Sequence, residues 1–217
     1  EVTAVGQGVR RLAVGDWVLP ATAPFGTWRQ RAVATEDSFL KVRNDIPAEY
    51  AGTMSVNMGT AHRLLEDFQS LQPGDWIVQN GANSMVGLAV IQMARERGIH
   101  TINVVRGDGP DTDVKLRLLA SMGGDINVPD SYLDTHQFRS LLKEVGSIKL
   151  GFNCVGGTSA LHTARVLGRG GVLVSYGGMA KQPLSLPADF VAEKASAFAT
   201  VYDCMRMYFM CIDIVSV

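Results

Sequence analysis

The sequence predicts an α/β protein built on a Rossmann-like, doubly wound parallel sheet. Short apolar runs rich in β-branched residues alternate with amphipathic segments between residues 74 and 175. One stretch in the middle of the chain also places a strand, a turn of small residues and a helix in direct succession, as a βαβ unit requires. Right-handed crossovers bring the carboxyl ends of such strands to one sheet edge, where ligands bind.

The first βαβ unit begins with an apolar run at residues 76–78, which follows a Pro-Gly-Asp turn. Such a run is typical of a strand that is buried on both faces. Helical spacing of apolar residues starts at Ser84 and stops at Gly98. A second buried strand is expected at 102–105 and ends in Arg106.

The turn at residues 80–87 precedes the helix, where unpaired amide N–H groups and the helix dipole favour an anion. The Gly-x-Gly-x-x-Gly fingerprint is absent, because Ala82 and the pair Asn83-Ser84 stand where its first two glycines would fall. Gly87 matches the glycine that packs the helix against the strand. As a motif this turn is a weak indication of a dinucleotide site.

Arg106 ends the second strand, where this fold meets the ribose of the adenosine. An acidic residue there indicates NAD, whereas an arginine accommodates the 2′-phosphate of NADP. The alternative is an ordinary solvated arginine in a loop. The position at the end of the strand favours recognition of NADP.

The alternation continues beyond Arg106. We expect helices over 113–122, 135–145 and 159–167 and strands over 125–128, 150–154 and 171–175. The last two strands lead into the glycine-rich loops 154–157 and 176–179. Each loop taken singly could be an ordinary βα turn, but glycine pairs also let backbone approach a flat ligand. Two such loops on one sheet edge favour a cofactor site.

The first part of the chain is rich in predicted strands, at residues 2–5, 17–19, 28–33 and 39–42. So few short strands cannot form a core of their own, so we expect residues 1–50 to be the remainder of a β-rich domain. A helical connection follows Pro47, with Asn57 and Thr60 on one helix face. These two polar residues satisfy backbone groups more often than they bind ligands.

Residues 51–190 are expected to form the nucleotide-binding domain, and 191–217 an atypical tail. Residues 190–199 could be helical, but the rest of the tail shows no clear period. The three charged residues within 202–217 argue against a membrane span there.

Composition favours a protein that handles small molecules. Hydrophobic residues make up 47% of the 217, and the net charge of -1 gives no electrostatic case for binding nucleic acid or membranes. The three cysteines form neither an even disulfide set nor a Cys-x-x-Cys metal motif, so we expect no structural zinc. The first residues show no targeting pattern and open on strand-like sequence, so we expect a piece of a longer protein.

Specific strings of residues give the chain a family resemblance. They are Gly-Asp-Trp at 15–17, Gly-Thr-Trp-Arg at 26–29, Val-Asn at 56–57, Leu-Gln-Pro-Gly-Asp at 71–75, Asn-Ser at 83–84, Thr-Ile-Asn-Val-Val-Arg at 101–106, Asn-Cys-Val-Gly-Gly at 153–157 and Tyr-Gly-Gly-Met-Ala-Lys-Gln-Pro at 176–183. With them the chain resembles the mitochondrial trans-2-enoyl-thioester reductases of the zinc-free medium-chain dehydrogenase/reductase superfamily. The resemblance covers roughly residues 2–187 and implies that residues 1–50 are the remainder of a GroES-like catalytic domain.

The resemblance also implies a set of residues that bind NADPH. They are Asn57, Asn83, Ser84, Met85, Val86, Arg106, Gly107, Asp108, Tyr176, Gly177, Gly178 and Met179. Arg106 and the two residues after it would hold the 2′-phosphate, and the loop 176–179 would lie along the nicotinamide. Met85 departs from the family, because a glycine is usual there.

The chemistry implied is reduction of a trans-2-enoyl thioester of coenzyme A or acyl carrier protein in mitochondrial fatty-acid synthesis. The family's proton donor is a tyrosine that none of the five tyrosines here matches, so we expect no catalytic residue in this chain and incomplete turnover. The family's next strand is also not recognisable after Phe190. Family members pair through the nucleotide domain, which implies a homodimer. Alternatives are a zinc-free quinone reductase and a non-catalytic module that binds NADPH or another protein.

Overall fold

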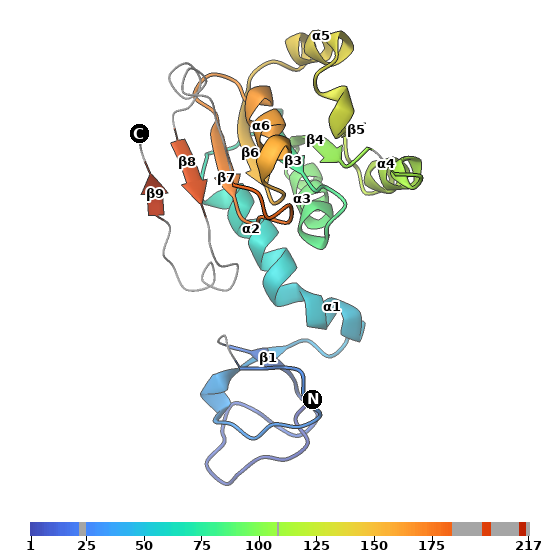
Figure 1. Ribbon diagram of the computed structural model, residues 1–217. Helices are drawn as coiled ribbons and strands as arrows, with labels where there is room; N and C mark the ends of the chain where they lie inside the picture. Colours follow the sequence, from blue (N-terminus) through green and yellow to red (C-terminus); the bar gives the residue numbers. More distant parts are fainter. Residues whose placement is uncertain (22–24, 108, 184–196, 201–212, 216–217) are drawn as a thin grey trace. The chain divides into compact units, whose positions relative to one another are not determined.

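The computed structural model describes residues 1–21, 25–107, 109–183, 197–200 and 213–215. The chain forms two compact units, residues 1–59 and residues 60–217 (Figure 1). The domain limits expected from the sequence, at residues 50 and 190, stay predictions.

The first unit contains a two-stranded antiparallel sheet. Strand β1 (Trp17–Pro20) pairs with β2 (Phe39–Val42), and a 3-10 turn, η1 (Glu36–Ser38), precedes β2. The strands predicted at 2–5 and 28–33 are wrong, since neither segment is part of a sheet. Trp28 and Val33 are fully exposed, so their strand propensity has no neighbouring strand to pack against.

The predicted helical connection after Pro47 is confirmed, in three pieces. Helix α1 (Ala48–Thr53) runs into a π-helical turn, η2 (Met54–Met58), and α2 (Gly59–Glu66) follows. A π turn of this kind has no local sequence signal that periodicity could have found. Asn57 lies within η2, in the first unit.

The second unit is built on a seven-stranded sheet with the order β5-β4-β3-β6-β7-β8-β9. Its strands are β3 (Trp76–Asn80), β4 (His100–Val105), β5 (Ile126–Pro129), β6 (Ile148–Asn153), β7 (Val172–Ser175), β8 (Ala197–Thr200) and β9 (Asp213–Val215). All neighbours from β5 to β8 are parallel, and β9 alone pairs antiparallel. The predicted parallel sheet is confirmed.

Helices cover both faces of this sheet, as a doubly wound fold requires. They are α3 (Met85–Glu96), α4 (Thr112–Ser121), α5 (His136–Val145) and α6 (Gly157–Val166), and Figure 1 shows them alternating with the strands. On one face α3 and α4 bury Ile91 and Leu119 against Val105. On the other face α5 and α6 bury Phe138 and Ala164 in a larger cluster. A short 3-10 turn, η3 (Asp130–Tyr132), follows β5.

A row of amide side chains, two buried and one half-buried, crosses the sheet beneath α3. Gln79, on β3, donates from its Nε2 to the carbonyl of Gly87 at 3.0 Å and to Asn103 Oδ1 at 2.8 Å. Asn103 donates in turn to Asn127 Oδ1 at 3.0 Å, on β5. Buried amides of this kind are costly unless they are paired, so the row fixes the register of three strands and the start of α3.

Strand β8 corrects two expectations about the end of the chain. Residues Ala197 to Thr200 pair with β7 in a parallel ladder, so the helix predicted to reach residue 199 is wrong there. The strand that the sequence did not reveal after Phe190 is therefore present. Backbone pairing with β7 overrides local propensity at this position. Residues 190–196 and most of the predicted tail lie outside the described residues.

Candidate functional site

The turn between β3 and α3 forms the floor of the candidate site. Ser84 is the N-cap of α3, and its hydroxyl oxygen accepts a hydrogen bond from the backbone N–H of Gly87 at 3.1 Å. Gly81 has a φ of +59°, and a Cβ there would lie 2.5 Å from the sulfur of Cys154. The turn therefore needs glycine at Gly81, and it presents the amino end of α3 to the sheet edge.

Arg106 and Gly107 extend from β4 at the same edge. The Gly107 N–H donates to Asp130 Oδ1 at 3.1 Å, which fixes the segment that follows the strand. Arg106 is exposed, and no carboxylate in the described part of the chain forms an ion pair with it. Its guanidinium is thus available for an anion.

The two glycine-rich loops lie side by side beyond β6 and β7. The N–H of Met179 donates to the carbonyl of Cys154 at 3.0 Å, and the N–H of Ala180 donates to Val155 at 2.8 Å. These bonds join the two loops beyond the ends of the strands. The two loops therefore act as one wall of the site.

The structure shows why glycine is required at three positions in these loops, and the reason is packing within the chain and not approach to a ligand. Gly156 and Gly157 both have positive φ, and a Cβ on either would meet Gln182 of the neighbouring loop. A Cβ on Gly177 would press on Cys154, whereas Gly178 has open space around it. Packing within the chain thus accounts for three of these glycines.

These segments enclose a pocket of about 350 Å³ at the carboxyl ends of the strands. It is lined by Gly81, Asn83, Ser84, Val104, Val105, Arg106, Lys115, Asp130, Cys154, Val155, Ser159 and Met179. Four of the predicted cofactor residues share this pocket, namely Asn83, Ser84, Arg106 and Met179.

The remaining predicted residues lie around the pocket or outside what the structure describes. Met85 and Val86 form the first turn of α3, with Met85 half-exposed and Val86 buried. Gly107 and Gly178 directly adjoin the lining residues Arg106 and Met179 in the chain, whereas Gly177 and Tyr176 lie two and three residues before Met179. Tyr176 is buried. Asn57 belongs to the first unit, and Asp108 lies outside the described residues, so their contacts with a cofactor stay predictions.

Sequence reasoning missed three polar lining residues: Lys115, Asp130 and Ser159. Lys115 donates to Asp111 at 3.0 Å one helical turn earlier, which holds the pKa of Asp111 below its ordinary value. That i,i+4 spacing was visible in the sequence, but the spacing alone does not tell which side of α4 meets the sheet edge. Ser159 carries no local signal beyond its place after Gly156-Gly157.

This arrangement fits an anionic nucleotide on the evidence of its own donors. The amino end of α3, the ammonium of Lys115 and the guanidinium of Arg106, which has no carboxylate partner in the described ranges, all border one pocket. Because the Ser84 hydroxyl accepts from Gly87, its own proton is free to be donated. Asp130 is the carboxylate in the lining, and two backbone N–H groups hold it.

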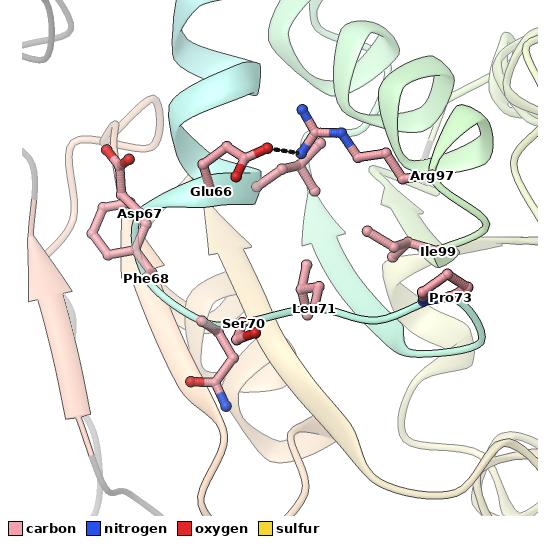
Figure 2. Close-up of a pocket in the computed structure, with 10 residues that line it drawn as sticks. Glu66, Asp67, Phe68, Ser70, Leu71, Pro73, Arg97 and Ile99 are labelled. Carbon is pink, nitrogen blue, oxygen red and sulfur yellow. Dashed lines mark ion pairs between the residues drawn. The ribbon is translucent and has the colours of Figure 1, made fainter.

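A larger pocket of about 670 Å³ fits such a ligand poorly. Figure 2 shows it between the segment after α2 and the segment before β4, where Glu66 and Arg97 point toward each other and pair at 2.7 Å. Its charged lining residues are Glu66, Asp67 and Arg97, which leave an excess of negative charge, whereas Arg106, Lys115 and Asp130 leave an excess of positive charge in the other pocket, so a phosphate is disfavoured here. It lies near Pro73 and Ile99, just before β3 and β4 begin, whereas sheets of this class bind ligands at the carboxyl ends of strands.

Comparison with known proteins identifies the relatives of this chain. The mitochondrial enoyl-[acyl-carrier-protein] reductase of Dictyostelium discoideum is 48% identical to it over 187 residues. The chain is a homologue of the mitochondrial enoyl-[acyl-carrier-protein] reductases. The match covers 86% of this chain and 53% of the Dictyostelium reductase, so the chain spans about half the length of that relative. No family model matches the sequence.

Solved enoyl thioester reductases share the fold. The complex of Etr1p with NADP and crotonyl-CoA is 34% identical, covers 87% of this chain and 56% of its own, and superposes with a TM-score of 0.82. The mitochondrial Etr1p/Etr2p heterodimer from Candida tropicalis is 33% identical, covers 91% of this chain and 58% of its own, and gives a TM-score of 0.84. Both the predicted fold class and the predicted superfamily are confirmed.

Within the described ranges, no group of three or more histidine, cysteine, aspartate or glutamate side chains could hold a metal ion. The helices of that part are also too short or too polar to cross a bilayer.

Proposed function

We propose that this chain is the NADPH-binding part of an enzyme that reduces trans-2-enoyl thioesters of coenzyme A or acyl carrier protein. The observation that carries the proposal is the 48% identity with a mitochondrial enoyl-[acyl-carrier-protein] reductase over most of the chain. The pocket adds independent support, because Arg106 and the amino end of α3 suit a phosphorylated dinucleotide.

In this proposal different residues of the pocket bind different parts of the cofactor. The backbone amides at the start of α3 and the Ser84 hydroxyl bind the pyrophosphate. Arg106, with Gly107 and Asp108, binds the 2′-phosphate, while the loop 176–179 lies along the nicotinamide. Asn57 reaches the same cofactor in the family pattern, and that contact is part of the proposal.

When bound, NADPH supplies the hydride that is added to the β-carbon of the enoyl thioester. The residues of this chain bind the dinucleotide, orient it and exclude water from its reactive end. The loops 154–157 and 176–179 suit this role, since backbone hydrogen bonds hold them together as one wall of the pocket.

The same relatives also support a proposal on location and assembly. We propose a mitochondrial protein, because the relatives carry that location in their names. We also propose a homodimer, since Etr1p pairs with Etr2p in a related reductase. Sedimentation of the purified chain would measure the assembly, and a monomer at all concentrations would contradict it.

Calorimetry with NADPH tests the binding step directly on the 217-residue chain. We expect one NADPH per chain, and a module that only binds other proteins would show no NADPH signal. Oxidation of NADPH with crotonyl-CoA or with a quinone then distinguishes a thioester reductase from a quinone reductase. Because no tyrosine here matches the family's proton donor, we expect slow turnover of the thioester. A full rate would contradict that expectation, and faster turnover of quinone would overturn the proposed substrate.

A further inference from the structure

Two buried asparagines join the ends of neighbouring strands beneath the pocket. Asn80 ends β3 and Asn153 ends β6, and both are at most 2% exposed. Asn80 Nδ2 donates to Asn153 Oδ1 at 2.8 Å. Asn153 Oδ1 also accepts from the N–H groups of Val155 at 3.2 Å and Gly156 at 3.0 Å. We call Asn80 and Asn153 the amide clasp.

The orientation of the Asn80 amide follows from its partners. The backbone N–H of Cys154 can only donate, and it donates to Asn80 Oδ1 at 2.8 Å. The oxygen of Asn80 therefore faces Cys154, and its nitrogen faces the other way. That nitrogen lies 3.1 Å from the hydroxyl oxygen of Ser159. Ser159 must accept this hydrogen bond, because an amide NH₂ cannot accept one.

A hydroxyl that accepts keeps its own proton for another partner. Within the described part of the chain, Ser159 Oγ makes no hydrogen bond besides the one from Asn80. Ser159 is half-buried and lines the pocket that also holds Ser84 and Arg106. The Ser159 hydroxyl can thus donate a hydrogen bond beside the nucleotide site. The hydrogen bond from Asn80 restricts the direction in which this O–H points.

We propose that Ser159 donates a hydrogen bond to a phosphate or ribose oxygen in the nicotinamide half of the bound dinucleotide. The inference rests on the proposed function, since it requires NADPH in this pocket. The sheet order indicates which half of the dinucleotide lies near Ser159, because β6 lies on one side of β3 and β4 lies on the other. Arg106 follows β4, whereas Ser159 is on α6, which follows β6. Arg106 and Ser159 therefore meet different ends of an extended ligand.

The experiment compares NADPH with 2′,5′-ADP, which lacks the nicotinamide half. Ser159→Ala removes the donor but leaves the amide clasp intact, since Asn80 still bonds to Asn153. We expect calorimetry on the 217-residue chain to show NADPH binding weakened about three- to ten-fold. Binding of 2′,5′-ADP should stay unchanged. Thr158→Ala, an exposed neighbour on α6, is the matched control and should alter neither.

A second variant tests whether the clasp directs the proton. Asn80→Asp keeps an acceptor for Cys154 but replaces the NH₂ by an oxygen, which can no longer donate to Asn153 or to Ser159. Ser159 would then turn its proton toward the aspartate. Adding Ser159→Ala to Asn80→Asp should then cause no further loss of NADPH binding. Thermal unfolding verifies that each variant is folded. Should Asn80→Asp not fold, Ser159→Ala still decides the proposal.

The outcomes separate this inference from the proposed function. If the unaltered chain does not bind NADPH, the proposed function fails. If the unaltered chain and Ser159→Ala bind NADPH equally, the role of Ser159 is refuted and the proposed function stands. Equal weakening of NADPH and 2′,5′-ADP would also refute it, because the effect would then be a general change in the shape of the pocket.

Discussion

Gly87 packs directly against the backbone of Ala82, so that a Cβ on Gly87 would lie 2.4 Å from the Ala82 carbonyl oxygen. The atoms in the way are backbone atoms of the turn that precedes α3, and they cannot rotate aside as a side chain would. The contact explains why the last glycine of the dinucleotide fingerprint is present at this position. It holds the amino end of α3 close to the sheet edge.

We therefore expect Gly87→Ala to destabilise the second unit by about 2 kcal/mol, since overpacking in a close-packed contact costs that much. NADPH binding should weaken as well, because the turn must move. Urea unfolding measures the first effect and calorimetry the second. Gly178→Ala is the control for stability, as a Cβ there meets nothing within 4 Å. Equal stability of the two variants would contradict the packing argument.

Gln79→Glu tests the buried amide row. The Nε2 of Gln79 donates to Gly87 and to Asn103, and the side chain is fully buried. A glutamate would turn a carboxylate oxygen toward two acceptor oxygens, so we expect a loss of about 3 kcal/mol or more in the free energy of unfolding.

Gln92→Glu is the matched control for that substitution. Gln92 lies on the exposed side of α3, where its side chain bonds only to the carbonyl of Leu88. We expect its unfolding free energy to change by less than about 0.5 kcal/mol. A comparable loss in both variants would show that the amide row does not stabilise the sheet.

Local signals in the sequence were enough for the alternating part of the fold. Ser84 is the N-cap of α3 and Gly146 is the C-cap of α5. Residue preferences at helix caps depend on neighbouring residues only, so both helix ends could be predicted. Arg106 could be placed for the same reason, because it directly follows a buried strand.

Features that depend on distant residues could not be predicted. The amide clasp joins residues 73 positions apart, and nothing in the alternation says that β6 rather than β4 supplies the partner of Asn80. Lys115 was missed because the sequence does not show how α4 packs on the sheet, and only that packing places Lys115 in the pocket. The strand wrongly predicted at 28–33 shows the opposite error, since its residues favour a strand locally but have no partner strand to pair with.

Asp75 makes stability depend on pH. Its carboxylate accepts from the Gln72 N–H at 2.8 Å and from Lys149 at 2.9 Å, and these contacts hold its pKa below the ordinary value of 3.8. A carboxyl whose pKa is lowered by folding stabilises the protein above the pKa of the unfolded chain. That stabilisation is lost as the pH falls through the lower pKa of the folded protein.

Asp75→Asn keeps an acceptor for Gln72 but removes the charge that Lys149 pairs with. We expect it to cost about 1 kcal/mol at neutral pH, because the pair is partly exposed. The difference from the unaltered chain should shrink as the pH falls below 3.8. Asp113→Asn, on an exposed position of α4, serves as the control. A difference that is independent of pH would exclude the ionised carboxylate as its cause.

Arg106→Ala tests the basis of cofactor choice. The guanidinium ends β4, lines the pocket and has no carboxylate partner among the described residues, so its charge is free to bind the 2′-phosphate. Hydrogen bonds to charged groups contribute about 1.5 to 3 kcal/mol, so the variant should bind NADPH about ten-fold or more weakly. NADH lacks that phosphate, and its affinity should hardly change.

Two further variants make the outcome specific to the position of the charge. Arg106→Lys keeps the charge but loses the planar fork of donors, so its affinity for NADPH should fall between those of the alanine variant and the unaltered chain. Arg117→Ala removes an exposed charge of α4 that does not line the pocket, and it should leave both affinities as they are. If Arg106→Ala weakened NADPH and NADH equally, Arg106 would act on the shape of the site, and selection of the phosphorylated cofactor would need another residue.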